Sequence, residues 1–409
     1  MKSRIFSALM LLVVGVVIAF PQEASAVPVF ARKYGFSCTM CHSNMPRLND
    51  FGQRYRANGY RLMDRENEDQ TVLESPAPVA FRTSAGYNAL MYNDEVDLDN
   101  GSDFAVNGLD LLSAGLLGSK IGFLMVYTPQ IAEERGVAGQ EGSLEMASVI
   151  FSNLGCSPWL NLRVGRFEPA YVPFSVKREI SVSPLEVYDV TFPEGPAFST
   201  TQSGLEVSGH GAAPFRYAAG IVGGSATNRS IDSPSDVYGR ISYVVGPGEG
   251  QTAGQRIGIL GYMGCARPGS GGGNRECFYR FGADASLNVS MVNLAGQFLY
   301  GSDDKTLWPG SDATEDVTWW GGFGELTLMP MVNLVGFARF DYVDMPKISD
   351  QDVTISDQDV TRMTAGGRFY FEDHVALHCE ISQRIVNAVV ADADDAQETS
   401  VTARVDFAF

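Results

Sequence analysis

The chain has 409 residues, and its 30 basic and 48 acidic side chains give a formal net charge of −18 and a sequence pI near 4.6. This acidity argues against a nucleic-acid-binding protein, because such proteins need clustered positive charge. A composition that is 45% hydrophobic, 11% aromatic and only 19% charged argues against disorder, and 44 glycines indicate many short turns.

Residues 1–26 have the pattern of a secretory signal peptide. Lys2 and Arg4 precede the apolar run 8–19, and small residues at 24–26 form a cleavage site. An N-terminal membrane anchor is the alternative, but a helix needs about 20 apolar residues to cross a bilayer. We therefore predict export to a compartment in which disulfides persist and haem is attached covalently.

The rest of the chain divides into a head at 27–63, a short acidic linker at 64–75 and a long body at 76–409. The head has a net charge of +5 and the body has a net charge of −20. Opposite charges attract over a Debye length of about 8 to 10 Å, so we expect the head to be drawn to the body. The alternative is that each set of charges only solubilises its own surface.

The head is predicted to contain short helices. Leu48, Phe51 and Tyr55 recur on one face of a helix. Asn58 and Gly59 then supply a stop signal.

The head also contains the motif Cys38-Thr39-Met40-Cys41-His42. In a C-x-x-C-H string the two thiols add to the vinyl groups of one haem, and the adjacent histidine ligates the iron. Zinc is the alternative, but a structural zinc site needs four ligands and the sequence has no second CxxC. A thioredoxin-like dithiol is a further alternative, but it would need a βαβ pattern around the motif, and the sequence shows none. We therefore predict one covalent haem c bound by Cys38 and Cys41, with His42 as the axial iron ligand.

The second axial ligand of this haem is left open by the sequence. Met63 is a candidate because it lies 21 residues beyond His42, and His/Met ligation would raise the reduction potential. Simple packing beside Leu62 is the alternative for Met63. A histidine of the body, or no protein ligand, is also open.

The body has the alternation of a transmembrane β-barrel. Leu334, Phe340 and Tyr342 share one parity of a strand, whereas Arg339 and Asp341 share the other. The polar parity is predicted to face the lumen. A soluble β-sandwich or a propeller is the competing fold, but the sequence has no repeat of blade length.

About sixteen antiparallel strands are predicted after residue 75. Their spacing suits strands of about 9 to 11 residues plus connections. The predicted strands start near Val79, Ser102, Lys120, Gly142, Pro158, Thr201, Pro214, Asp236, Gln255, Asn274, Ser290, Glu315, Met331, Gln358, His374 and Gln397.

Four cysteines lie outside the haem motif. Cys265 and Cys277 flank a loop of turn residues, so a disulfide between them is predicted to clamp a hairpin. Cys156 and Cys379 are interpreted as buried or lipid-facing thiols. The body histidines His210, His374 and His378 are too scattered for a metal motif. Of the three, only His378 is a candidate for mutation, because it lies beside Glu380 on a polar parity.

The sequences 29–38, 46–55 and 59–60, together with the Cys-x-x-Cys-His motif, resemble the fused cytochrome-porins of iron-oxidising bacteria. The resemblance implies an outer-membrane barrel plugged by a small helical cytochrome. It also implies that the haem takes electrons from extracellular Fe(II) and passes them to a periplasmic cytochrome, as an Fe(II):cytochrome c oxidoreductase. Only Cys38, Cys41 and His42 carry over as site residues.

The resemblance leaves two alternative functions open. The first is outward electron transfer to an external acceptor, and the second is a diffusion porin whose cytochrome head serves as a plug. For the iron-oxidising function, an acidic lumen and acidic loops are expected to attract Fe²⁺. Outer-membrane lipid surrounds the barrel in all three interpretations.

Overall fold

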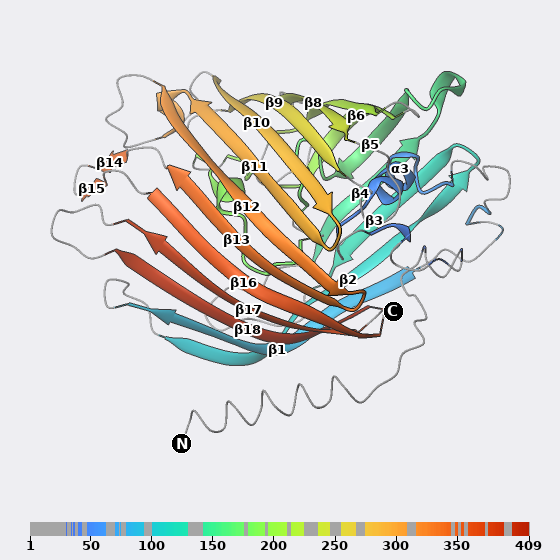
Figure 1. Ribbon diagram of the computed structural model, residues 1–409. Coiled ribbons are helices and arrows are strands. Elements are labelled where there is room, and N and C mark those ends of the chain that lie inside the picture. Colours follow the sequence, from blue (N-terminus) through green and yellow to red (C-terminus); the bar gives the residue numbers. More distant parts are fainter. Residues whose placement is uncertain are drawn as a thin grey trace.

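The computed structural model describes residues 30, 34, 36, 40–42, 47–62, 70–72, 74, 79–93, 100–129, 142–175, 179–192, 195–210, 214–224, 236–245, 255–266, 275–308, 316–344, 348–350, 353–355, 359–372, 375–387 and 395–408. Within these residues sixteen strands form one closed antiparallel barrel, and the first strand pairs with the last. Figure 1 shows this closure, with β1 beside β18. The sixteen strands predicted from the alternation are confirmed.

The barrel strands follow one another around the wall in chain order. They are β1 (Val79–Tyr92), β2 (Gly101–Gly118), β3 (Ile121–Thr128), β4 (Ser143–Phe151), β5 (Asn161–Phe167), β6 (Gln202–His210), β7 (Phe215–Val222), β8 (Asp236–Val244), β9 (Arg256–Ala266), β10 (Glu276–Val289), β11 (Val292–Asp303), β12 (Val317–Met331), β13 (Leu334–Asp344), β16 (Asp359–Glu372), β17 (Val375–Val386) and β18 (Ala396–Ala408). The short strands β14 (Ile348–Asp350) and β15 (Val353–Ile355) form a separate two-stranded sheet.

The two faces of the wall follow the period-2 alternation of the sequence. On β13, Arg339 and Asp341 are buried inside, whereas Phe340 is 48% exposed on the outer face. On β17, His378 and Glu380 are buried and Ile381 is exposed. Side chains of adjacent residues on a strand point to opposite faces, so an apolar outer face and a polar inner face result. The predicted parities are confirmed.

The long connection 168–201 between β5 and β6 is packed against the inner wall. Its Tyr171, Leu185 and Tyr188 are at most 1% exposed and belong to the largest hydrophobic core, which also contains Leu299 of β11 and Trp319 of β12. Leu299 and Trp319 lie on the inward-facing parity of their strands. The lumen therefore differs from the uniformly polar interior that the alternation predicted, because an inserted segment supplies apolar partners for part of the wall.

The described part of the head lies against the end of the barrel that has the short turns. Helix α3 (Asp50–Ala57) ends at Asn58, as the stop signal predicted. Arg61 donates to the carbonyl of Ser119, between β2 and β3, and Gly59 lies so close to Gly122 of β3 that a Cβ on Gly122 would overlap it. Helix α3 contacts β6, and its Tyr55 shares an apolar cluster with Ile150 of β4, near which Figure 1 draws the helix. In outer-membrane barrels the short turns are periplasmic.

No helix in the described residues has the length and apolarity needed to cross a membrane.

Candidate functional site

The described part of the C-x-x-C-H motif is a short turn that pairs with the chain just before α3. His42 forms an antiparallel bridge with Leu48, and its Nδ1 lies 3.2 Å from the carbonyl oxygen of Arg47. A histidine that donates from Nδ1 to a carbonyl carries its lone pair on Nε2, which is the arrangement of a metal-ligating histidine. Burial raises the pKa of the Cys41 thiol to about 11. Cys38 and Met63 lie outside the described residues.

Asn49 ties this turn to the helix. Its amide Nδ2 donates to the carbonyl of Met40 at 3.0 Å, and its Oδ1 accepts from the backbone N–H of Gly52 at 2.9 Å. The second contact is the N-cap of α3, which satisfies an N–H that has no partner within the helix. The backbone N–H of Asn49 also donates to the carbonyl of Cys41. Gly52 is required here, because a Cβ would overlap that carbonyl.

Ion pairs join the head to groups inside the barrel. Arg47 Nη2 lies 2.7 Å from Glu179 of the inserted connection and 3.0 Å from Glu325 of β12, and Arg56 pairs with Glu168. Burial alone would lower the pKa of Arg47, but the carboxylates of Glu179 and Glu325 raise it above its ordinary value, so the guanidinium remains charged. These contacts have the sign expected for a basic head drawn to an acidic body.

A cavity of about 190 Å³ separates the head from the wall. His210 of β6 lines it and is 3% exposed. Most of its charged groups are arginines, three from the head and four from the wall: Arg47, Arg54, Arg56, Arg163, Arg216, Arg240 and Arg256. The polar part of the lumen is thus rich in guanidinium groups.

The expectation of an acidic lumen that gathers Fe²⁺ is not met by the described residues. Asp284 lies between Arg240 and Arg256, and Arg163 pairs with Glu206. A carboxylate already paired with a guanidinium has little charge left to attract a free cation. These carboxylates of the described barrel interior are therefore already paired with arginines.

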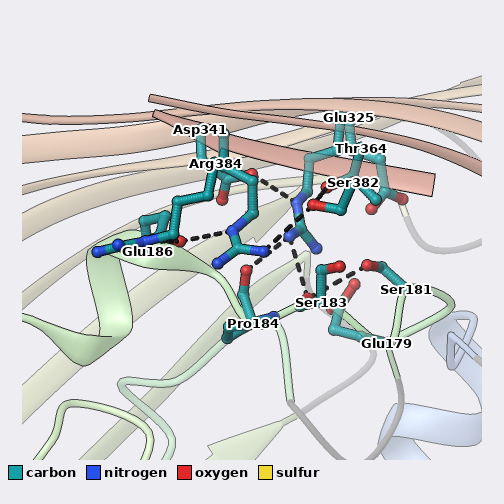
Figure 2. A network of polar contacts seen from close by, with 12 residues as sticks. Glu179, Ser181, Ser183, Pro184, Glu186, Glu325, Asp341, Thr364, Ser382 and Arg384 are labelled. Carbon is teal, nitrogen blue, oxygen red and sulfur yellow. Dashed lines mark hydrogen bonds and ion pairs between the residues drawn. The ribbon is translucent and has the colours of Figure 1, made fainter. Parts of the chain in front are cut away.

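A second polar network fixes residues 179–186 of the inserted connection to strands β13 and β17 of the wall. Figure 2 shows Glu186 approached by Arg384 of β17, whose Nε lies 3.1 Å from Oε1. Arg339 donates to the carbonyls of Ser183 and Pro184 at 3.0 and 2.6 Å. Glu380 accepts from the backbone N–H groups of residues 182 and 183, both at 2.8 Å.

This network gives His378, which was singled out in the sequence, a structural role. His378 Nε2 lies 3.2 Å from Glu380, so the histidine singled out in the sequence supports the carboxylate that holds the inserted connection. Glu186 and Asn49 were not predicted from the sequence. The signal for Glu186 was the length of connection 168–201, which exceeds what a turn between adjacent strands needs. The signal for Asn49 was its position just before a helical pattern, where an N-cap residue is expected.

Cys265, Cys277 and Cys379 agree with their predicted roles, whereas Cys156 is neither buried nor on a strand face. Cys265 and Cys277 form a disulfide between adjacent strands β9 and β10. Cys379 is exposed on the outer parity of β17, and Cys156 is exposed at a turn. His374 lies outside the described residues. Among the described residues no three His, Cys, Asp or Glu side chains gather into a metal site.

Neither a protein-family model nor a curated protein matches this chain. Solved structures of outer-membrane porins do match. The anion-selective porin from Comamonas acidovorans has a TM-score of 0.58 at 13% identity, covering 81% of this chain and 100% of that one. The channel DcaP of Acinetobacter baumannii has a TM-score of 0.56 at 10% identity, with 81% and 97% covered. OmpT of Vibrio cholerae has a TM-score of 0.54 at 9% identity, with 81% and 99% covered.

At these identities the likeness shows the fold. The chain has the closed barrel of Gram-negative outer-membrane porins, and the outer-membrane location predicted from the sequence agrees with that fold and with the apolar outer face.

Proposed function

We propose that the protein is an outer-membrane electron conduit with one covalent haem c. It oxidises extracellular Fe(II) and reduces a periplasmic cytochrome, as an Fe(II):cytochrome c oxidoreductase. The observation that carries the proposal is the position of the C-x-x-C-H turn: His42 belongs to a head whose Arg47 and Arg56 form ion pairs with groups inside the barrel, at its short-turn end.

The residues present fit a haem. Cys38 and Cys41 would hold it through thioethers and His42 would ligate its iron. The contact between His42 Nδ1 and the Arg47 carbonyl favours Nε2 as the ligating atom. When bound, the haem supplies a one-electron centre. The chain itself supplies the rest, because Asn49 fixes the turn that carries His42.

The iron substrate and the direction of electron flow rest on the resemblance to cytochrome-porins. A barrier of about 25 to 30 Å of hydrocarbon separates a periplasmic cytochrome from external iron, so a haem held inside a barrel shortens the gap on both sides. Outward transfer to an external acceptor uses the same residues with the opposite driving force.

Stopped-flow mixing of the purified protein with Fe(II), read at the haem absorption bands, tests this function. We expect covalent haem and its reduction by Fe(II). His42→Ala and Cys41→Ser are expected to lose the bound haem or its normal spectrum, while Cys156→Ser, at an exposed turn, serves as the matched control. Absence of haem from the wild-type protein, or a haem that Fe(II) does not reduce, would contradict the proposal.

A diffusion porin with the head as a plug is the second candidate. The porin fold and the arginine-lined cavity favour it, and one of the similar structures is an anion-selective porin. Conductance in a planar bilayer distinguishes the two functions. A large steady current through the full-length protein supports the diffusion porin, and the absence of a current supports the conduit.

A further inference from the structure

The interior of the barrel contains an unbroken series of aromatic rings whose first member, Phe174, lies under the guanidinium of Arg47 of the head. Arg47, whose carbonyl contacts His42, lays its guanidinium over the ring of Phe174 at 5.1 Å. The ring of Phe174 lies 5.2 Å from that of Phe323 on β12, and Phe323 lies 6.5 Å from Tyr188. Phe174 and Tyr188 both belong to the inserted connection 168–201, so the series starts in this connection, where Phe174 lines the arginine-rich cavity.

From Tyr188 the series continues toward the opposite end of the barrel. The ring centroids are 5.3 Å apart from Tyr188 to Phe198, 4.8 Å from Phe198 to Tyr171 and 4.9 Å from Tyr171 to Tyr262. Tyr262 lies 5.7 Å from Phe278. Every step lies within or near the 4.5 to 7 Å range in which aromatic rings pack directly against one another.

The series ends at the mouth that carries the long loops. Phe278 is the third residue of β10, next to the disulfide between Cys265 and Cys277. Arg280 lies over Phe278 and also over Trp319, at 5.1 and 4.9 Å. Long loops are extracellular in outer-membrane barrels. The rings therefore connect the extracellular mouth with the residues around His42.

The phenol groups along the series are held in fixed partnerships. Tyr188 donates to Gln297 and Tyr262 donates to Asp236. Burial raises the pKa of Tyr188 well above its ordinary value, so its phenol keeps its proton at neutral pH. The rings of Tyr188 and Tyr262 are therefore buried, and their hydroxyl groups keep their protons and donate hydrogen bonds to fixed partners.

We propose that this series of rings is the route along which an electron passes between the extracellular mouth and the group held by His42. The inference rests on the proposed function. Delocalised π orbitals in direct contact couple better than aliphatic side chains across the same distance. In the inward direction, a ferrous ion at the mouth loses one electron and becomes ferric, the group held by His42 gains that electron, and the rings keep all their bonds and protons.

Tyr171 is the position at which to interrupt the route, because it joins Phe198 to Tyr262. Tyr171→Leu removes the ring, whereas Tyr171→Phe keeps it and removes only the hydroxyl group. Trp320→Leu is the matched control on the outer face of the same wall, where Trp320 lies 5.2 Å from Tyr342 and is 41% exposed. Haem content, barrel folding and the disulfide are verified in each variant.

The first measurement is haem reduction after Fe(II) is added at the long-loop side of oriented vesicles. We expect Tyr171→Leu to slow reduction about tenfold, which corresponds to roughly 1.4 kcal/mol of activation free energy. Tyr171→Phe and Trp320→Leu are expected to react at the wild-type rate. A folded, haem-loaded Tyr171→Leu that reacts at the wild-type rate would overturn the route and leave the rings a packing feature only.

The second measurement does not use iron. A photoreducing ruthenium complex is attached at Lys305→Cys, near the long-loop mouth, in a background with Cys156→Ser and Cys379→Ser, and the haem is monitored after a flash. Electron injection that is fast in this background and about tenfold slower with added Tyr171→Leu supports the route even where Fe(II) fails as a substrate. Equal injection rates in both would overturn the route while leaving iron oxidation intact.

Discussion

The two halves of the lumen are filled in chemically different ways. At the short-turn end the head meets the wall mainly through arginines and carboxylates around a cavity of about 190 Å³. A small apolar cluster, in which Tyr55 and Tyr60 pack with Ala114 and Ile150, adds to these contacts. Toward the long loops, the connection 168–201 packs against the wall mainly through aromatic and aliphatic side chains with almost no exposure, and the polar network at 179–186 adds to this contact. One barrel wall therefore accepts two inserted segments with different kinds of contact.

The difference indicates how permanently each segment is held. Apolar burial is non-directional and insensitive to salt, so connection 168–201 is part of the core of the barrel. Ion pairs need partners in a defined geometry, and the loss of one partner leaves a buried charge. The position of the head therefore depends in part on particular charges.

The largest expected effect is in the apolar half. Tyr188→Ala removes a ring that is 1% exposed and should lower the free energy of unfolding by about 4 kcal/mol, because a cavity remains. Urea titration of the barrel in micelles measures this loss. Tyr300→Ala, on the outer face and 39% exposed, is the control and should lose less. Equal losses would mean that the inserted connection is not part of the core.

The next largest effect is in the polar half. Arg47→Ala leaves Glu179 and Glu325 without their shared cation, and we expect docking of the head to weaken by about 3 kcal/mol. Protection of the head from added protease measures docking. Arg47→Lys keeps the charge and should lose less. Unchanged protection in Arg47→Ala would show that ion pairs do not hold the head.

A smaller effect is expected within the head. Asn49→Ala removes the N-cap of α3 and the contact with Met40, and should destabilise the head by about 1 kcal/mol. Helical circular dichroism and the yield of covalent haem are the measurements. Asn49→Ser keeps a cap acceptor but has no amide, so a haem yield that falls equally in both variants assigns the effect to the amide contact. A normal yield in Asn49→Ala would contradict a positioning role.

The smallest effect is that of salt on the wild-type protein. Raising ionic strength from about 0.1 M to 1 M shortens the Debye length from about 10 Å to 3 Å, although buried pairs are screened less than exposed ones. We expect a slight increase in protease access to the head and no change in unfolding governed by the apolar half. If salt changed protease access to the head and unfolding of the apolar half to the same extent, the two halves would not differ in the kind of contact that holds them.

Much of the fold was predictable because it depends on local pattern. Strands with one face toward lipid must alternate with period 2, so Phe340 and Asp341 reveal their faces from the sequence alone. The turn residues between Cys265 and Cys277 likewise indicate a hairpin, and the structure pairs these two cysteines directly. The stop of α3 at Asn58 follows from the adjoining Gly59.

The contents of the lumen were decided only by the tertiary structure. Arg47 meets Glu325, and Tyr171 meets Tyr262, across many intervening strands, and no local period records which inward residues will face an inserted segment. Charge counts gave the sign of the attraction between head and body, but the pairing of Asp284 with two arginines depends on the register of the closed barrel. The sequence by itself determined a barrel and a C-x-x-C-H motif. Closure of the barrel brought distant side chains into one interior, and only there were their partners chosen.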